Sequence, residues 1–172
     1  MKIQYKFQSF ILVSFMIAAL TSCALFETNV PPKQHTLTAK EAYNLLNKEG
    51  DNILFIDVRT PKELINEGKP TPIDANIPYK FTKLNKAEKK YDWLDNNDFV
   101  PSIEEQMKNK QLDKQNTIIL ICHEGRRSSQ AVSTLTEAGY KKVYSITGGI
   151  IDGWEKEGLP LSYTLDGEEV SF

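Results

Sequence analysis

The sequence has few residues suited to a metal centre or to disulfides. It contains two cysteines, Cys23 and Cys122, two histidines, His35 and His123, and no C-x-x-C pair. This set is too small and too scattered for a typical metal site, so we expect neither a metal nor another cofactor. A basic excess is also missing, since the formal net charge is −2. That balance argues against a nucleic-acid-binding protein, which would show a basic surface.

No apolar run is long enough to span a bilayer. The longest, residues 10–20, falls short of the ~20 residues that a transmembrane helix needs. It follows Lys2 and Lys6 and has the length of a signal-peptide core. We therefore predict a signal peptide over residues 1–22 and a tether over residues 23–36.

The segment Leu20-Thr21-Ser22-Cys23 resembles the lipobox of bacterial lipoproteins. The resemblance implies cleavage before Cys23, lipidation of its thiol and an exported protein held on the cell envelope by lipid. In a Gram-negative cell, Ala24 favours the outer membrane or the periplasmic face. The alternative is an ordinary export signal with an incidental cysteine. If Cys23 carries lipid, Cys122 has no disulfide partner and is a candidate reactive thiol.

Apolar runs alternate with helical patterns in the rest of the chain. This order predicts an α/β fold with a central parallel sheet and helices on both faces. The domain should cover residues 37–161 and leave 162–172 as a C-terminal tail. Predicted strands lie at 53–56, 75–78, 118–121 and 143–146, and predicted helices at 39–49, 61–68, 128–138 and 150–156.

Residues 80–116 form an insertion rich in lysine, acids and asparagine. Such a segment is too long for a bare loop in a compact domain. We predict a helix over 101–109. Large aromatic side chains mostly act through burial, so we expect Tyr91, Trp93 and Phe99 to be packing anchors rather than ligand contacts.

Cys122 stands at the carboxyl end of a predicted strand, where ligands bind in open parallel sheets. Gly125 permits a tight turn, and Arg126 and Arg127 add positive charge before a helix whose N-terminus is itself electropositive. These features favour the thiolate and would also hold an anion. The alternative is an inert buried cysteine, although no apolar residue follows until Ala131.

Four stretches of the sequence form a recognisable series along the chain. They are D-V-R at 57–59, N-I-P at 76–78, C-x-x-G-x-R-S at Cys122, Gly125, Arg127 and Ser128, and the strand, G-G turn and helix over 143–154. Each motif alone is unspecific, but in this order they are specific, and the chain resembles the single-domain rhodanese family over residues 36–161.

This resemblance implies a sulfurtransferase that forms a persulfide on Cys122. The sulfur would come from a sulfane donor such as thiosulfate or polysulfide and would pass to a thiol or another nucleophilic acceptor. Backbone N–H groups of the loop would hold the outer sulfur. The implied binding loop consists of His123, Glu124, Gly125, Arg126, Arg127 and Ser128.

The roles of the charged residues follow from the same resemblance. Arg127 would stabilise the loop and its charge, and Arg126 would contact the donor from the solvent side. Asp57 and Arg59 would support the loop, with a structural role favoured over substrate contact. His123 either assists proton transfer or is an exposed loop residue.

Two features depart from the family pattern. Residues 68–75 lack the histidine that usually precedes N-I-P. Glu124 also places a negative charge inside the loop, which should weaken attraction for a dianion and favour a neutral or bulkier donor.

Two other functions stay open. Related phosphatases and arsenate reductases place five residues between cysteine and arginine, whereas four lie between Cys122 and Arg127. A non-catalytic module that binds a partner or senses persulfide would use the same fold, although it would not need a reactive thiol.

Overall fold

The protein is described here by a computed structural model covering residues 35–165 and 168–171. The predicted signal peptide and Cys23 lie outside the described residues. Within those two ranges, no helix has the length and apolar character needed to cross a membrane.

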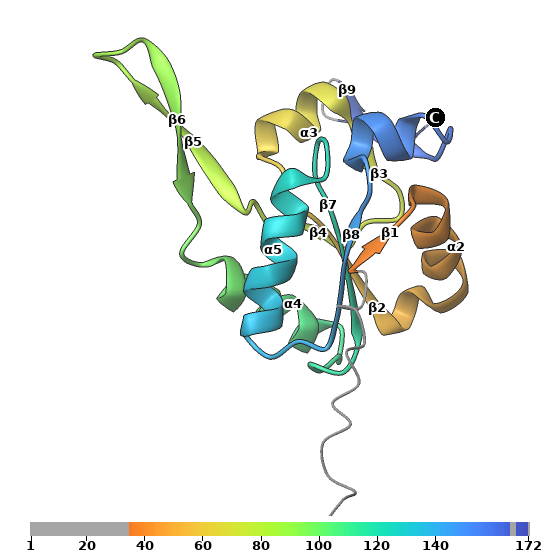
Figure 1. The fold of residues 1–172 in the computed structure, drawn as a ribbon. Helices are drawn as coiled ribbons and strands as arrows, with labels where there is room; N and C mark the ends of the chain where they lie inside the picture. Colours follow the sequence, from red (N-terminus) through yellow and green to blue (C-terminus); the bar gives the residue numbers. More distant parts are fainter. Residues whose placement is uncertain (1–34, 166–167, 172) are drawn as a thin grey trace, which may run out of the picture. The chain divides into compact units, whose positions relative to one another are not determined.

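The centre of the domain is a sheet of five parallel strands in the order β1-β8-β7-β2-β4 (Figure 1). This confirms the predicted α/β fold with a parallel sheet. The short outer strands bring the start of the domain and the N-I-P segment against the longer central ones. The strands are β1 (Thr36–Leu37), β2 (Ile53–Asp57), β4 (Ala75–Asn76), β7 (Thr117–Ile121) and β8 (Lys142–Ile146).

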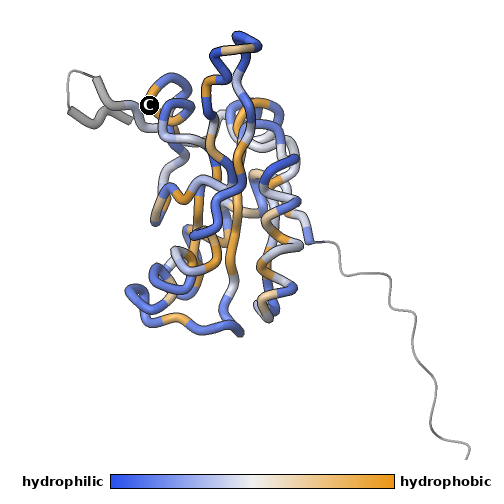
Figure 2. Tube along the Cα trace, turned by 90° about the vertical axis from the view of Figure 1, so that its left-hand side faces the viewer, coloured by the Kyte–Doolittle hydropathy of each residue, from blue (hydrophilic) through white to orange (hydrophobic). Residues whose placement is uncertain are grey.

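Successive side chains of β2 enter two different hydrophobic clusters. Leu54 and Ile56 face one side of the sheet, and Ile53 and Phe55 face the other. This alternation is the two-residue period of a strand. Both faces are buried, so the strands read as continuous apolar runs, and Figure 2 shows the hydrophobic colour concentrated along them.

Helices cover both faces of the sheet (Figure 1). Buried residues of α4 and α5 pack on the face of Leu54, and those of α2 and η2 pack on the face of Phe55. The helices are α2 (Ala39–Glu49), α3 (Pro61–Glu67), α4 (Phe99–Asn109), α5 (Arg126–Glu137), the 3₁₀ turn η1 (Gly50–Asn52) and the π-helix η2 (Gly149–Glu155).

The N-termini of α2 and α3 are both held by capping boxes. The Thr38 backbone N–H donates to Glu41 at 2.8 Å, and the Thr60 N–H donates to Glu63 at 2.9 Å. Each box satisfies backbone groups that a helix start leaves without a partner. The predicted helix over 101–109 begins two residues earlier, at Phe99, with Pro101 in its first turn.

The first part of the 80–116 insertion is a β-hairpin formed by β5 (Lys80–Asn85) and β6 (Lys90–Asp95). It extends away from the sheet (Figure 1). The prediction that Tyr91 and Trp93 are packing anchors is wrong, because they are 62% and 52% exposed. A two-stranded ribbon with no layer packed on it cannot bury them. Phe99 is buried, as predicted.

Residues expected to form a C-terminal tail form strands instead. β9 (Leu161–Leu165) pairs with β3 (Lys69–Pro70) and with β10 (Glu168–Ser171) in an antiparallel sheet. The side chains of Leu161 and Ser162 are buried. The pairing with β3 is a long-range contact that no local pattern over 162–172 indicates.

Candidate active site

The thiol of Cys122 lies directly after β7 and is surrounded by the turn that leads into α5. The side chain is 1% exposed. The backbone N–H of Gly125 donates to Sγ at 3.1 Å, and that of Ser128 donates at 3.4 Å. Donors aimed at sulfur stabilise negative charge on it, as does the N-terminus of a helix.

Gly125 allows the loop to close on the sulfur. Its φ is +92°, a conformation that L side chains rarely adopt. This turn lets α5 begin at Arg126, so both arginines lie in the first helical turn. The helix therefore starts two residues before the predicted Ser128.

Ser128 connects the thiol to a neighbouring strand. Its hydroxyl oxygen lies 3.4 Å from Cys122 Sγ and 2.7 Å from the Ser145 hydroxyl of β8. It also donates to the Gly125 carbonyl at 3.1 Å. Both serines are buried, so their hydroxyl groups satisfy each other without solvent.

The start of η2, where Gly148 is followed by Gly149, holds the loop through backbone hydrogen bonds. Ile150 N–H donates to the Cys122 carbonyl at 2.9 Å, and Ile151 N–H donates to the His123 carbonyl at 3.2 Å. A Cβ on Gly149 would overlap the Cys122 carbonyl oxygen. The close approach of these two backbones explains why glycine stands at position 149.

Asp57 and Arg59 form a fully buried ion pair behind the site. The Arg59 Nη2 to Asp57 Oδ2 distance is 2.7 Å, and the Arg59 backbone N–H adds a hydrogen bond of 2.9 Å. Burial raises the pKa of the Asp57 carboxyl, and the charge and hydrogen bonds of Arg59 oppose that shift. Asn76 donates to the carbonyl groups of both residues at 2.9 and 2.8 Å. The D-V-R and N-I-P segments are thus one hydrogen-bonded unit, and neither charged side chain is exposed.

Arg127 pairs with Glu63 of α3 at one side of the site. Its two terminal nitrogens lie 2.8 and 2.5 Å from the carboxylate oxygens. Burial alone would raise the pKa of the Glu63 carboxyl, but the hydrogen bonds from Arg127 and Thr60 outweigh it and lower that pKa to about 2. The guanidinium carbon also lies 5.1 Å from the centre of the Trp93 ring.

Arg126 and Glu124 lie on the solvent side of the loop. Arg126 Nη2 is 2.5 Å from Glu124 Oε2, and the Arg126 side chain is 84% exposed. The negative charge of Glu124 therefore has a partner on the same loop. The exposed position of Arg126 is compatible with the expected donor contact.

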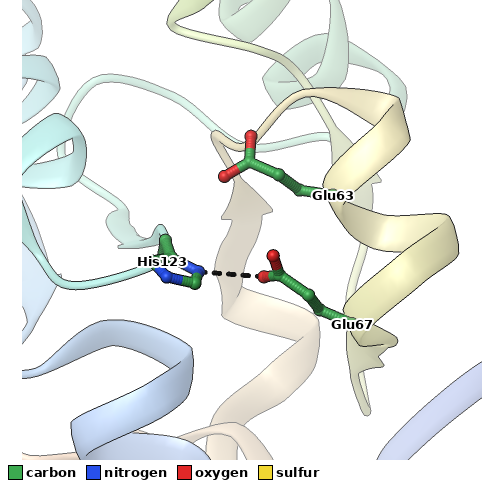
Figure 3. A group of neighbouring side chains, drawn as sticks. All are labelled: Glu63, Glu67 and His123. Atoms are coloured by element: carbon green, nitrogen blue, oxygen red, sulfur yellow. Dashed lines mark hydrogen bonds and ion pairs between the residues drawn. The ribbon is translucent and has the colours of Figure 1, made fainter.

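His123 is only partly exposed, because it packs against α3. Its Nδ1 lies 2.9 Å from Glu67 Oε2, and Figure 3 shows the imidazole directed at that carboxylate with Glu63 beside it. The same Glu67 oxygen accepts from Arg59 at 3.0 Å. Glu67 thus links the loop to the buried Asp57–Arg59 pair.

Ligand atoms of Glu63, Glu67 and His123 lie within 4.8 Å of one another. Both carboxylates already accept hydrogen bonds from arginine, Glu63 from Arg127 and Glu67 from Arg59. These bonds compensate the two negative charges and account for the cluster without a cation.

A pocket of about 420 Å³ opens over the thiol. Its loop side is lined by Cys122, His123, Glu124, Arg126 and Arg127. Other elements contribute Glu63, Lys80, Trp93 and Gln130. None of these four was a sequence-predicted site residue. The T-x-x-E capping pattern before Glu63 indicates a helix start and not a site, and no local signal marks Trp93.

Comparison with known proteins places this site in a family. Residues 38–157 match the family described as the rhodanese-like domain. The chain belongs to the rhodanese family. The match contains the thiol, its loop, the Asp57–Arg59 pair and the G-G turn.

This rhodanese-like domain matches some relatives over about half of their length and others over nearly all of it. It is 41% identical over 51 residues to a thiosulfate sulfurtransferase GlpE of Actinobacillus pleuropneumoniae, covering 30% of this chain and 46% of that protein, about half of the relative's length. It is 27% identical over 111 residues to GlpE of Vibrio cholerae, covering 64% of this chain and 96% of that one. A polysulfide-sulfur transferase from Wolinella succinogenes is similar in structure, with a TM-score of 0.51, 29% identity, and coverage of 73% and 76%.

Proposed function

We propose that this rhodanese-like protein is a sulfurtransferase that carries sulfane sulfur as a persulfide on Cys122. The observation that supports this most directly is the geometry at sulfur: a buried thiol at the base of a pocket accepts hydrogen bonds from Gly125 and Ser128 N–H groups. Such donors stabilise the attacking thiolate and the anionic persulfide that follows.

The reaction needs no redox partner. With thiosulfate as donor, the Cys122 thiolate attacks the outer sulfur, the S–S bond of the donor breaks, and sulfite leaves with the electron pair. A nucleophilic acceptor then attacks the outer sulfur of the persulfide and returns the thiolate. Backbone N–H groups between His123 and Ser128 would hold the outer sulfur.

The charges around the pocket bear on the choice of sulfur donor. Three cations line the pocket, and each is paired: Arg127 with Glu63, Arg126 with Glu124 and Lys80 with Asp95. A dianion therefore meets no uncompensated side-chain charge. This pairing favours donors that do not depend on two strong charge contacts.

The test is sulfur transfer by the full-length chain beside its Cys122→Ser variant. We expect a mass gain of one sulfur on Cys122 after exposure to thiosulfate or polysulfide, and thiocyanate on adding cyanide. The variant should show neither. Phosphate release from an aryl phosphate without sulfur gain would favour the phosphatase alternative, and stable folding with no sulfur gain from either donor would favour a binding module.

We also propose that the protein is exported and anchored to the bacterial envelope by lipid on Cys23. The support is the lipobox-like sequence after an apolar run of signal-peptide length. Growth with a labelled fatty acid should label the protein, and Cys23→Ser should abolish the label. Label retained in that variant would overturn the proposal.

A further inference from the structure

The β5–β6 hairpin exposes an unusual number of large apolar side chains beside the active site. Elsewhere in the described part of the chain, Ile65 is the one other large hydrophobic residue exposed to this degree. Exposed apolar clusters of this kind mark binding surfaces. The exposed residues of the hairpin are Phe81, Leu84, Tyr91, Trp93 and Leu94.

The pairing of the hairpin divides these residues between two faces. Thr82 is opposite Trp93 and Leu84 is opposite Tyr91, whereas Phe81 is opposite Leu94. Since side chains alternate along a strand, Leu84, Tyr91 and Trp93 share one face, and Phe81 and Leu94 share the other. We call the first of these the Trp93 face.

The Trp93 face is continuous with the pocket over Cys122. Trp93 and Lys80, which lie on this face, line that pocket. A molecule that takes sulfur from the buried thiol therefore passes Trp93. Tyr91 lies two residues further along the strand, about 7 Å from Trp93 at ~3.3 Å per residue.

The length of the Trp93 face distinguishes a small acceptor from a polypeptide acceptor. A small acceptor with its nucleophile at Cys122 would reach Trp93 but not the far end of the face. A polypeptide with its cysteine in the pocket would continue over Tyr91 and Leu84. Among the described strands, none other pairs with β5 or β6, so an extended segment has a free strand edge to pair with.

The charge of the hairpin indicates the character of that segment. Residues 80–95 hold five lysines and three acids, although the whole chain is net negative. In the region that the structure describes, Lys86 and Lys89, in the turn at the end of the hairpin, form no ion pair. These free charges favour an acidic partner.

We infer that the Trp93 face is the docking surface for a protein acceptor, an extended acidic and apolar segment that presents a cysteine to the persulfide on Cys122. This inference rests on the proposed sulfurtransferase function. The acceptor thiolate attacks the outer sulfur, the bond between that sulfur and Cys122 Sγ breaks, and Cys122 returns as thiolate. The acceptor leaves as a persulfide, with no oxidant or reductant consumed.

The experiment compares two double variants of the full-length chain in mild detergent. One changes the Trp93 face, Leu84→Thr with Tyr91→Thr, and the matched control changes the opposite face, Phe81→Thr with Leu94→Thr. Threonine keeps the strand propensity, and none of the four positions lines the pocket. Each protein is loaded with sulfur and offered cyanide, or a synthetic peptide in which alternating glutamate and leucine precede a single cysteine. A second peptide has lysine in place of glutamate.

We expect the Trp93-face variant to lose about tenfold or more in kcat/KM for the glutamate peptide, the scale of a lost interface hot spot, with cyanide turnover unchanged. The control variant should match wild type with both acceptors, and the lysine peptide should be a poor substrate. Equal peptide transfer by both variants would overturn the inference.

Two other outcomes also decide the matter. In the first, wild type sediments with anionic phospholipid vesicles, whereas the Trp93-face variant does not sediment but transfers sulfur to the peptide normally. That result would assign the face to a membrane and overturn the inference. Failure of the proposed function appears separately, as no sulfur on Cys122 and no cyanide turnover in wild type. Failure of the inference alone leaves both intact.

Discussion

Arg127 and Glu63 form a two-point ion pair across 64 positions of sequence, and this pair joins the first turn of α5 to the first turn of α3. The arginine of the loop motif is thus held by a carboxylate of another helix. The pair is largely buried, and Trp93 covers its guanidinium. The position of the loop therefore depends on α3 as much as on α5.

Removing this carboxylate should destabilise the fold in a pH-dependent way. The pKa of Glu63 is lowered from 4.5 to about 2 in the folded protein, so its contribution is complete above pH 4.5 and is lost as pH falls through about 2. We expect Glu63→Gln to lower the free energy of unfolding at pH 7 by about 1–3 kcal/mol. Urea denaturation across this range should show the difference from wild type shrinking with acid. A constant difference would contradict the role of the ionised pair.

The buried Asp57–Arg59 pair makes a different prediction. Asp57→Asn removes the fully buried partner of Arg59 and leaves it one acidic partner, Glu67 at 3.0 Å, so part of its buried charge is uncompensated. The change should cost about 3–5 kcal/mol of unfolding free energy. The double change Asp57→Asn with Arg59→Met removes that uncompensated charge and should recover part of the loss. Chemical denaturation of the three proteins tests this. If the double variant were less stable than Asp57→Asn, the uncompensated charge would not be the cause.

Gly149 should be sensitive because of its close approach to the loop. Its φ is +58°, and a Cβ would overlap the Cys122 carbonyl oxygen. Gly158 is a matched control, with φ +62° and nothing within 4 Å of a Cβ. We expect Gly158→Ala to cost about 1 kcal/mol through backbone strain alone, with normal sulfur transfer. Gly149→Ala should cost more and reduce kcat at least about tenfold, since a displacement of about 1 Å at reacting atoms has effects of this size. Equal behaviour in thermal melts and sulfur transfer would show that the overlap is relieved elsewhere.

Glu124 should influence the choice of donor. Its carboxylate pairs with exposed Arg126 at the solvent side of the pocket. Glu124→Gln removes one negative charge and frees Arg126, so KM for thiosulfate should fall about twofold to fivefold, the range of an exposed charge pair. KM for an uncharged donor, such as a dialkyl trisulfide, should change less. Steady-state kinetics with both donors measure this, and an unchanged KM for thiosulfate would mean that Glu124 does not repel the dianion.

Much of this fold could be predicted from the sequence alone. Apolar runs flanked by helical patterns predicted the parallel sheet because a strand buried on both faces needs continuous hydrophobic residues. The loop after Cys122 could also be predicted, because its turn, its charges and the helix start that follows are encoded by neighbouring residues. Boundaries shifted by up to two residues, as at Arg126 and Phe99, because the ends of a helix depend on its caps and turns as well as on the hydrophobic period.

Other features depended on contacts between distant segments. Hydrophobicity correctly indicated burial for Phe99 but not for Tyr91 and Trp93, because burial requires a second layer and the hairpin has none. The partners of the loop, Glu63 and Glu67, lie on a helix more than fifty residues earlier, at separations of 64 and 56. The local sequence specified the Cys122 thiol and the backbone N–H groups around it, because all of them lie in one turn. Only the tertiary structure decided which carboxylates pair with the arginines of the loop and which side chains from other elements line the pocket over Cys122, because both depend on where separate elements meet.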